Sequence, residues 1–176
     1  FVKVPAWTKS EMGQTNPWPG TENNIHVTLA TNVPLTVECS RIEIFHLDGA
    51  CAKSKRLLSG ANAAAFKDLA GNRGYGSWKS VEEPEWTGSL EAEEATLSLV
   101  PFNDTSPYAL YIFSFNFTNP VDSQNSPGVQ VRALGIPIAA QHFTKEPDAP
   151  TTTSPCHSLS IACKWIAGDA APLRVY

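Results

Sequence analysis

The side chains that most often perform chemistry are scattered along this sequence. The histidines are His26, His46, His142 and His157. A metal site needs a second histidine or cysteine at a defined spacing, and only His157 has such a neighbour, Cys156, directly beside it. We interpret that adjacency as a coincidence within a loop. We therefore expect structural or surface roles for the histidines, and no bound metal.

A run of glutamates could supply the paired carboxylates of a glycosidase or the ligands of a calcium ion. Its members are Glu82, Glu83, Glu85, Glu91, Glu93 and Glu94. The Asp and Asn spacing of a calcium loop is missing, so we interpret the run as a solvated surface. The segment "GYGSWKS" lacks the closing glycine of a nucleophile elbow, and no glycine-rich run ends in Gly-Lys-Ser/Thr. These patterns predict a protein that is not an enzyme and uses no cofactor.

The cysteines are even in number, which suits disulfide bonds in an oxidising compartment. They are Cys39, Cys51, Cys156 and Cys163. Proximity in sequence favours the pairs Cys39–Cys51 and Cys156–Cys163, although spacing alone leaves every pairing open. Buried free thiols are the alternative interpretation. A zinc site is disfavoured because no two cysteines have the short C-x-x-C spacing.

Three groups of residues point to sugars. The tryptophans Trp7, Trp18, Trp78, Trp86 and Trp165 could form a stacking platform, or they could pin loops to a core. The sequons Asn103-Asp104-Thr105 and Asn116-Phe117-Thr118 are no more frequent than chance, yet they predict N-glycosylation at Asn103 and Asn116. A Pro/Thr-rich stretch at 147–155 predicts O-linked sugars on Thr151, Thr152 and Thr153.

Composition narrows the class of protein. The chain has 176 residues, which suits one domain with a real core. A net charge of −4 disfavours nucleic acid as a partner, because a nucleic-acid-binding protein needs a basic face. No apolar run approaches the length of a membrane span. The chain begins at Phe1 without a basic-then-apolar leader, so we expect a processed protein or a piece of a longer one.

The clearest element is a strand over 108–118. Four aromatic residues, Tyr111, Phe113, Phe115 and Phe117, alternate with a mostly polar set. Because side chains of a strand alternate between two faces, this spacing predicts an aromatic buried face and a polar outer face. Asn119-Pro120 ends the strand, because proline removes a ladder donor.

The remaining pattern predicts eight or nine strands, many turns and one short helix of about two turns near 61–70. This order favours an all-β fold, an antiparallel two-sheet β-sandwich that is immunoglobulin-like or jelly-roll-like, with a barrel as the alternative. We divide the chain into an N-terminal linker or docking segment at 1–24, a β-sandwich domain at 25–146, and a Pro/Thr-rich loop with C-terminal strands at 147–176. The last segment completes the domain or docks to a neighbour.

Several segments together resemble a repeat of large extracellular proteins of algae and other protists. The segments are "IHVTLATNVPL", "GSW", "LSL" and "YIFSFNFTNPVDSQNSPGVQV", within roughly residues 14–133. Proteins with this repeat resemble surface adhesins and flagellar-hair (mastigoneme-like) components built as strings of β-sandwich domains. The resemblance implies no catalytic residue. It implies an extracellular or cell-surface location and a structural role.

The ends of the sequence extend this hypothesis. Joining the C-terminal end to the start of another copy gives "PLRVYFVKV", a run of β-favouring residues. We expect a structural module of an extracellular filament or surface coat that assembles with copies of itself, head to tail, through terminal strands. Covalent glycans are a further expected partner. A carbohydrate-binding or cell-surface-binding adhesion module is the alternative.

Overall fold

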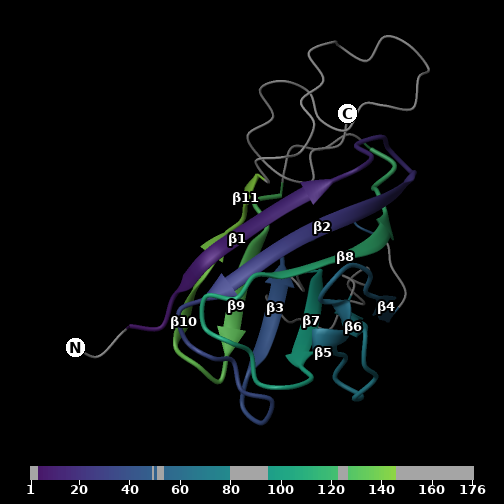
Figure 1. The fold of residues 1–176 in the computed structure, drawn as a ribbon. Coiled ribbons are helices and arrows are strands. Elements are labelled where there is room, and N and C mark those ends of the chain that lie inside the picture. The colour runs from purple at the N-terminus through teal and green to yellow at the C-terminus, as the bar shows by residue number, and fades with distance from the viewer. Residues whose placement is uncertain (1–3, 49, 51–53, 80–94, 123–126, 146–176) are drawn as a thin grey trace, which may run out of the picture.

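The protein is a sandwich of two β-sheets, as the sequence predicts (Figure 1). The structure, a computed structural model, describes residues 4–48, 50, 54–79, 95–122 and 127–145. Within these residues no helix has the length and apolar character needed to cross a membrane.

The smaller sheet has four strands in the order β11-β1-β2-β8. Their bounds are β1 Trp7–Gln14, β2 Glu22–Thr31, β8 Tyr111–Thr118 and β11 Thr144–Lys145. The long neighbours pair antiparallel, and β2 matches β8 without a break from Glu22 opposite Thr118 to Leu29 opposite Tyr111. The short β11 lies parallel to β1.

The larger sheet has seven strands in the order β10-β9-β3-β7-β6-β4, and β5 pairs with β7 off this path. Their bounds are β3 Arg41–Phe45, β4 Lys55–Leu57, β5 Phe66–Lys67, β6 Tyr75–Lys79, β7 Thr96–Pro101, β9 Gln130–Leu134 and β10 Ile138–His142. All of these pairings are antiparallel. The chain changes sheet between β2 and β3, between β7 and β8, between β8 and β9, and between β10 and β11.

This strand order follows the immunoglobulin arrangement. In that fold strands A, B and E lie in one sheet, and C, F and G lie in the other. Here β1, β2 and β8 take the A, B and E places, while β3, β9 and β10 take the C, F and G places. Strands β7, β6 and β4 extend the second sheet beyond β3. Of the two sandwich types expected from the sequence, the described strands therefore match the immunoglobulin-like one.

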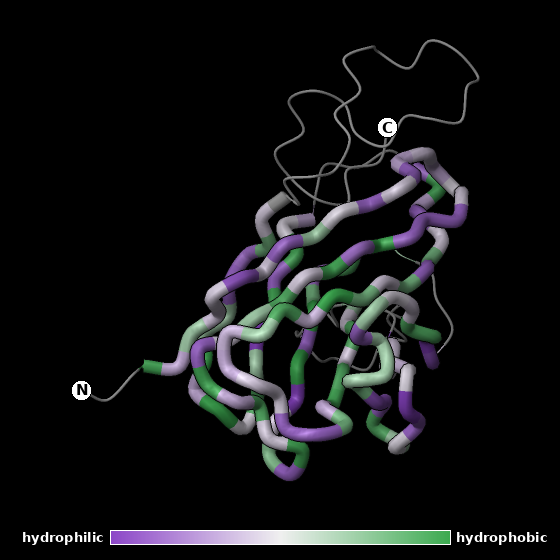
Figure 2. Tube along the Cα trace, in the orientation of Figure 1, coloured by the Kyte–Doolittle hydropathy of each residue, from purple (hydrophilic) through white to green (hydrophobic). Residues whose placement is uncertain are grey.

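The aromatic face of β8 forms the centre of the core, as its alternation predicts. Phe113, Phe115 and Phe117 are buried, whereas Asn116 on the other face is exposed. The Phe113 ring meets the ring of Phe66 edge to face at 5.2 Å, which joins the two sheets. Hydrophobic and hydrophilic residues accordingly alternate along several of the strands (Figure 2).

The expected short helix is present as a single 3-10 turn. It covers Ala63–Ala65, and β5 begins at the next residue. The alanine run favours helix, but Phe66 is extended because it pairs with β7. Packing of Phe66 in the core thus limits the helix to less than the two turns expected.

The sandwich begins earlier than the sequence indicates. Residues 7–14, assigned above to an N-terminal linker or docking segment, form β1 in the smaller sheet. The turn-forming residues that suggested a linker occupy the loop between β1 and β2. The expected C-terminal strands at 147–176 lie outside the described residues, as does the whole glutamate run.

Candidate functional site

The smaller sheet gives the molecule two distinct ends. Strands β1 and β11 run in the same direction, with Glu11 opposite Thr144 and Met12 opposite Lys145. The chain therefore enters the sheet at one end and leaves it at the other (Figure 1). We call the end that holds Trp7 and Thr31 the entry end, and the end that holds Gln14 the exit end.

A buried asparagine organises the exit end. Asn23 has no exposed surface, and its side-chain amide donates to Gln14 Oε1 at 3.0 Å and to Asn119 Oδ1 at 2.9 Å. Its Oδ1 accepts the backbone N–H groups of Thr15 and Asn16 at 3.2 and 3.0 Å. All four bonding positions of this amide are used, so β1, β2 and the residue after β8 are fixed to one another.

The same network presents an aromatic side chain to solvent. Asn119 donates to the backbone oxygens of Asn16 and Trp18, each at 2.8 Å, and the Thr21 hydroxyl also donates to Trp18 O at 2.7 Å. The Trp18 side chain is nevertheless 43% exposed. Because its backbone is held by several bonds, the ring is displayed on a preorganised loop.

Val121 completes an apolar patch beside this loop. Its side chain is 80% exposed. The chain around it is tied to the Trp18 loop, because Gly20 N–H donates to Pro120 O at 2.9 Å. A Cβ added to Gly20 would lie 3.8 Å from Val121 Cγ1, so the two segments are in van der Waals reach. We call Trp18 and Val121 the exit patch.

The entry end carries a second apolar group. Val4, Tyr108 and Leu110 are 76%, 55% and 49% exposed. Tyr108 N–H donates to Thr31 O at 2.7 Å, and the Asn32 side chain donates to Val4 O at 2.8 Å, so these segments meet at the end of β2. We call Val4, Tyr108 and Leu110 the entry patch.

Tyr108 has an unusual backbone. Its φ is 62°, in the left-handed region, which a bulky side chain rarely adopts and which costs on the order of 1–3 kcal/mol. The bond to Thr31 helps to hold this conformation. The consequence is that an aromatic ring projects from the entry end.

The outer edge of β8 is closed by a loop. Ser59 exchanges both backbone hydrogen bonds with Ser114, at 2.9 and 2.8 Å. Asn62 N–H donates to Ile112 O at 2.9 Å, and Ile112 N–H donates to Asn62 Oδ1 at 2.9 Å. The Arg56 guanidinium donates a hydrogen bond to the backbone oxygen of Asn116 at 3.2 Å. Capping of this kind blocks the addition of a strand from another molecule.

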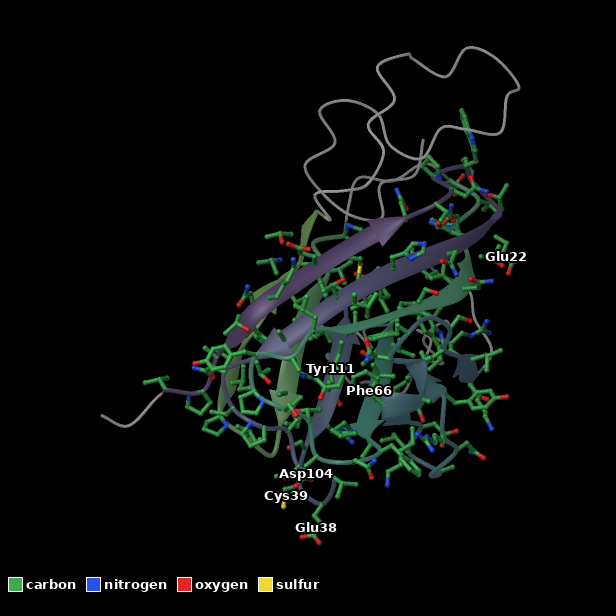
Figure 3. The ribbon with its side chains drawn as sticks, in the orientation of Figure 1. Glu22, Glu38, Cys39, Phe66, Asp104 and Tyr111 are labelled. Atoms are coloured by element: carbon green, nitrogen blue, oxygen red, sulfur yellow. The ribbon has the colours of Figure 1, made fainter. Side chains whose placement is uncertain are left out.

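The solvent face beside that edge is polar. Asn116 donates to Glu22 Oε1 at 2.7 Å and accepts a short hydrogen bond from Asn24. Arg56 lies nearby, where partial burial lowers its pKa and the Glu22 charge opposes that change. Glu22 lies far from Glu38 and Asp104 in the molecule (Figure 3). Both ends of the sandwich therefore carry acidic side chains.

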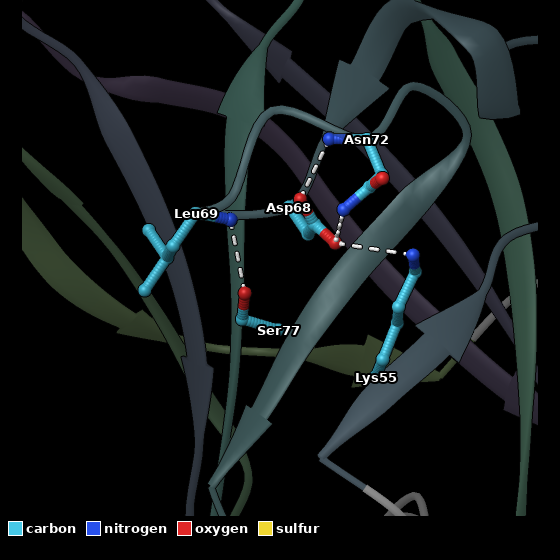
Figure 4. A network of polar contacts seen from close by, with 5 residues as sticks. All are labelled: Lys55, Asp68, Leu69, Asn72 and Ser77. Carbon is cyan, nitrogen blue, oxygen red and sulfur yellow. Dashed lines mark hydrogen bonds and ion pairs between the residues drawn. The ribbon is translucent and has the colours of Figure 1, made fainter.

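A buried carboxylate closes the turn between β5 and β6. Asp68 accepts the backbone N–H and the side-chain amide of Asn72, each at 2.7 Å, and Lys55 Nζ lies 3.8 Å away (Figure 4). Desolvation acts to raise the pKa of Asp68, but the hydrogen bonds from Asn72, the Lys55 charge and the Ala70 N–H outweigh it and hold the pKa below its usual range. This group shapes the turn between β5 and β6.

The described residues bring no metal-binding cluster together. Within them no cluster of three or more His, Cys, Asp or Glu side chains could hold a metal. A small cavity beside Trp7, Phe66 and Tyr111 has a volume of about 10 Å³. That is the space of about one water molecule, so this cavity is too small for a substrate.

The residues that the sequence singled out as candidate site residues differ in exposure, and some lie outside the described residues. Trp7 and Trp78 are buried, and both indole N–H groups lack a hydrogen-bond partner. Cys39 is exposed, while the other cysteines, Thr151, Thr152, Thr153, Trp86 and Trp165 lie outside the described residues. The disulfide pairing and the O-linked sugars remain predictions.

Both predicted N-glycosylation sites are accessible. Asn103 is exposed in the loop after β7, and Asn116 is exposed on the outer face of β8, as its parity predicts. Their modification itself stays a prediction. Of the histidines in the described residues, His26 is exposed on β2, and His142 Nδ1 meets Gly128 O at 3.1 Å.

Sequence reasoning missed the asparagine network. Asn23 has the same parity as Ile25, Val27 and Leu29, all of them buried. A polar residue in phase with an apolar stripe is the signal that could have found it, because such a side chain must be buried and bonded.

Comparisons with known proteins add no family: no family model matches the chain, and no curated protein is significantly similar to it.

Proposed function

We propose that this sandwich is a structural module of an extracellular filament or surface coat, in which copies follow one another head to tail. One observation carries the proposal: the first and last described strands of the smaller sheet are neighbours that run in the same direction. A chain that enters at one end and leaves at the other can be continued by another module along the same axis. Contacts of this type do not close a ring and generate linear assemblies.

The surface of the module supports the same proposal. The described residues contain no cluster of metal ligands, whereas exposed apolar side chains occur at both ends of the smaller sheet. The terminal strands that we expect to complete a neighbour's sheet lie outside the described residues. At β8 the edge is already capped, so contact between copies there would require the loop at 59–62 to move.

A carbohydrate-binding or cell-surface-binding module is the second candidate function. The exposed ring of Trp18 on a fixed loop favours it, since a pyranose ring stacks on an aromatic face. A glycan array distinguishes the two. Sugar binding by the full chain that disappears in Trp18→Ala, but persists in a variant of the exposed Leu57, would favour the second candidate.

The native mass of the protein tests the first candidate. Material extracted from its source without denaturants should sediment as particles much larger than the 19.0 kDa of one chain, and it should be accessible to labelling at the cell surface. Material that sediments as single 19.0 kDa chains under all mild conditions would contradict the proposal.

A further inference from the structure

The outer face of the larger sheet concentrates positive charge. The structure describes the side chains of eight lysines and arginines, and six of them lie on this face or in the turn beside it between β5 and β6. They are Arg41, Lys55, Lys67, Arg73, Lys79 and Arg132, and we call this group the basic face. On β3, β6 and β9 these positions alternate with the buried Ile42, Trp78 and Val131, so they point away from the core.

The described carboxylates of this face lie beneath its cations. Glu43 and Asp68 are only 6% and 3% exposed. Glu43 accepts from Arg41 at 2.8 Å and from Arg132 at 2.7 Å, while Asp68 lies 3.8 Å from Lys55 Nζ. Six cations against two buried carboxylates leave an excess of four positive charges on one face of a chain whose net charge is −4. Charge is therefore strongly segregated on this molecule.

The basic face is continuous across five strands. Lys55 on β4 lies opposite Ser77 on β6, which lies opposite Ser98 on β7. Ser98 lies opposite Glu43 on β3, which lies opposite Arg132 on β9. Directly opposed residues share a face, so these positions form one row. At about 4.8 Å between neighbouring strands, the row is about 19 Å long, with a cation at each end.

Aromatic rings hold several of the cations in place. Lys55 Nζ lies 4.2 Å from the centre of the Tyr75 ring, and the Arg73 guanidinium lies 4.3 Å from the centre of the Phe102 ring. Lys67 Nζ lies 6.0 Å from the same Phe102 ring, and the backbones of Lys67 and Arg73 form a bridge. Cations that rest on rings have little freedom to lose when an anion binds.

We propose that the basic face binds an anionic polysaccharide, a sugar chain that carries carboxylate or sulfate groups. Such a chain can lie along the row, with its charges near Lys55 and Arg132 and its hydroxyls near the half-buried Ser77 and Ser98. The inference goes beyond the proposed function, because it gives a structural module a surface that attaches it to a charged matrix.

The same observations disfavour other polyanions. A stable contact with a folded acidic protein needs an apolar centre, and the middle of this row consists of Ser77, Ser98 and Glu43. A nucleic acid has a dense row of phosphates that requires many cations, and the net charge of −4 on the whole chain opposes its approach.

Binding of the full chain to immobilised polymers tests the proposal. Polygalacturonate provides carboxylates, dextran sulfate provides sulfates, and uncharged dextran is the control. We expect binding to at least one of the two charged polymers and none to dextran. Salt screens charges beyond about 10 Å at 0.1 M, so the affinity should fall steadily as salt is raised.

Two charge reversals separate the basic face from the overall charge. Lys67→Glu should weaken binding about tenfold, because it removes an attractive charge and adds a repulsive one, while Lys67→Arg should bind like the parent. Lys9→Glu changes the net charge by the same amount, but Lys9 lies on the outer face of the smaller sheet beside Glu11. It should change the affinity less than about twofold. Trp18→Ala should also bind normally, which distinguishes this face from the second candidate function.

Circular dichroism establishes that each variant is folded, and Lys79→Glu replaces Lys67→Glu if the latter does not fold. Equal weakening by the reversals at 67 and 9, or no binding to either charged polymer, overturns the proposal. Tighter binding to single-stranded DNA or to polyglutamate than to both polysaccharides also overturns it. Assembly is measured separately: linear arrays that bind no polysaccharide remove only this inference, whereas native monomers that bind one remove only the proposed function.

Discussion

Replacement of Asn23 by alanine should destabilise the protein far more than replacement of its neighbour Asn24. The Asn23 side chain has no exposed surface and makes four hydrogen bonds. Asn24 is a partly exposed residue whose side-chain amide bonds to Asn116 on the solvent face. The pair is a matched control, because the two asparagines are adjacent on one strand and only one faces the core.

The magnitude follows from the hydrogen bonds that are lost. Alanine at 23 removes the donor to Gln14 Oε1 and the donor to Asn119 Oδ1, on side chains that are 3% and 2% exposed. A buried unsatisfied polar group costs about 1–3 kcal/mol, whereas the loop N–H groups of Thr15 and Asn16 can be hydrated. We expect Asn23→Ala to lower the free energy of unfolding by about 3–5 kcal/mol, out of a total of about 5–15 kcal/mol.

Urea denaturation monitored by far-UV circular dichroism measures this difference. The midpoint should fall strongly for Asn23→Ala with an unchanged slope, while Asn24→Ala stays within about 0.5 kcal/mol of the parent. A loss below about 1 kcal/mol at position 23, or an equal loss at position 24, would refute the view that this amide fixes the exit end.

Three further outcomes can be measured on the same chain. Gly135→Ala should be severely destabilising, because the φ of Gly135 is 83° and an added Cβ would lie 1.7 Å from the backbone oxygen of Cys39. Gly71 has a φ of 90° but nothing within 4 Å of an added Cβ, so Gly71→Ala should cost only about 1 kcal/mol. Equal melting temperatures for the two variants would contradict this. The pKa of Asp68 is lowered in the folded protein, so its ionised form stabilises the fold above the unfolded pKa of about 4, and this contribution is lost as the pH falls through the folded pKa. Asp68→Asn should therefore lower the free energy of unfolding at pH 7 and change it little near pH 2. A cost that does not vary with pH would count against this prediction. Expression in a eukaryotic secretory host should place glycans on both Asn103 and Asn116, because both are exposed; peptide mass spectrometry that finds Asn116 unmodified would mean that its bonds to neighbouring side chains exclude the sugar.

Periodicity predicted which residues face the core but not which strands pair. The alternation of β8 places Phe113, Phe115 and Phe117 inside, and the structure confirms it. Pairing depends on contacts far apart in sequence, such as β3 with β9, so the immunoglobulin-like order could not be read from local pattern.

The two ends were also beyond sequence reasoning. The segment "NPWPG" reads as a turn, and nothing local shows that Asn119, 101 residues after Trp18, holds it in place. Likewise the loop at 59–62 looks like the start of a helix, yet it closes the edge of β8 because Gly60, with φ 99°, lets its backbone approach Phe113 closely. These features depend on tertiary contacts between distant segments.

Electron cryomicroscopy of the native assembly tests the central claim most directly. The longest strand, β2, has 10 residues and spans about 33 Å at about 3.3 Å per residue. With its end loops, each module should repeat along a linear array at a spacing on the order of 40 Å. Separate 19.0 kDa particles, or an array joined side by side through the sheets, would contradict the account.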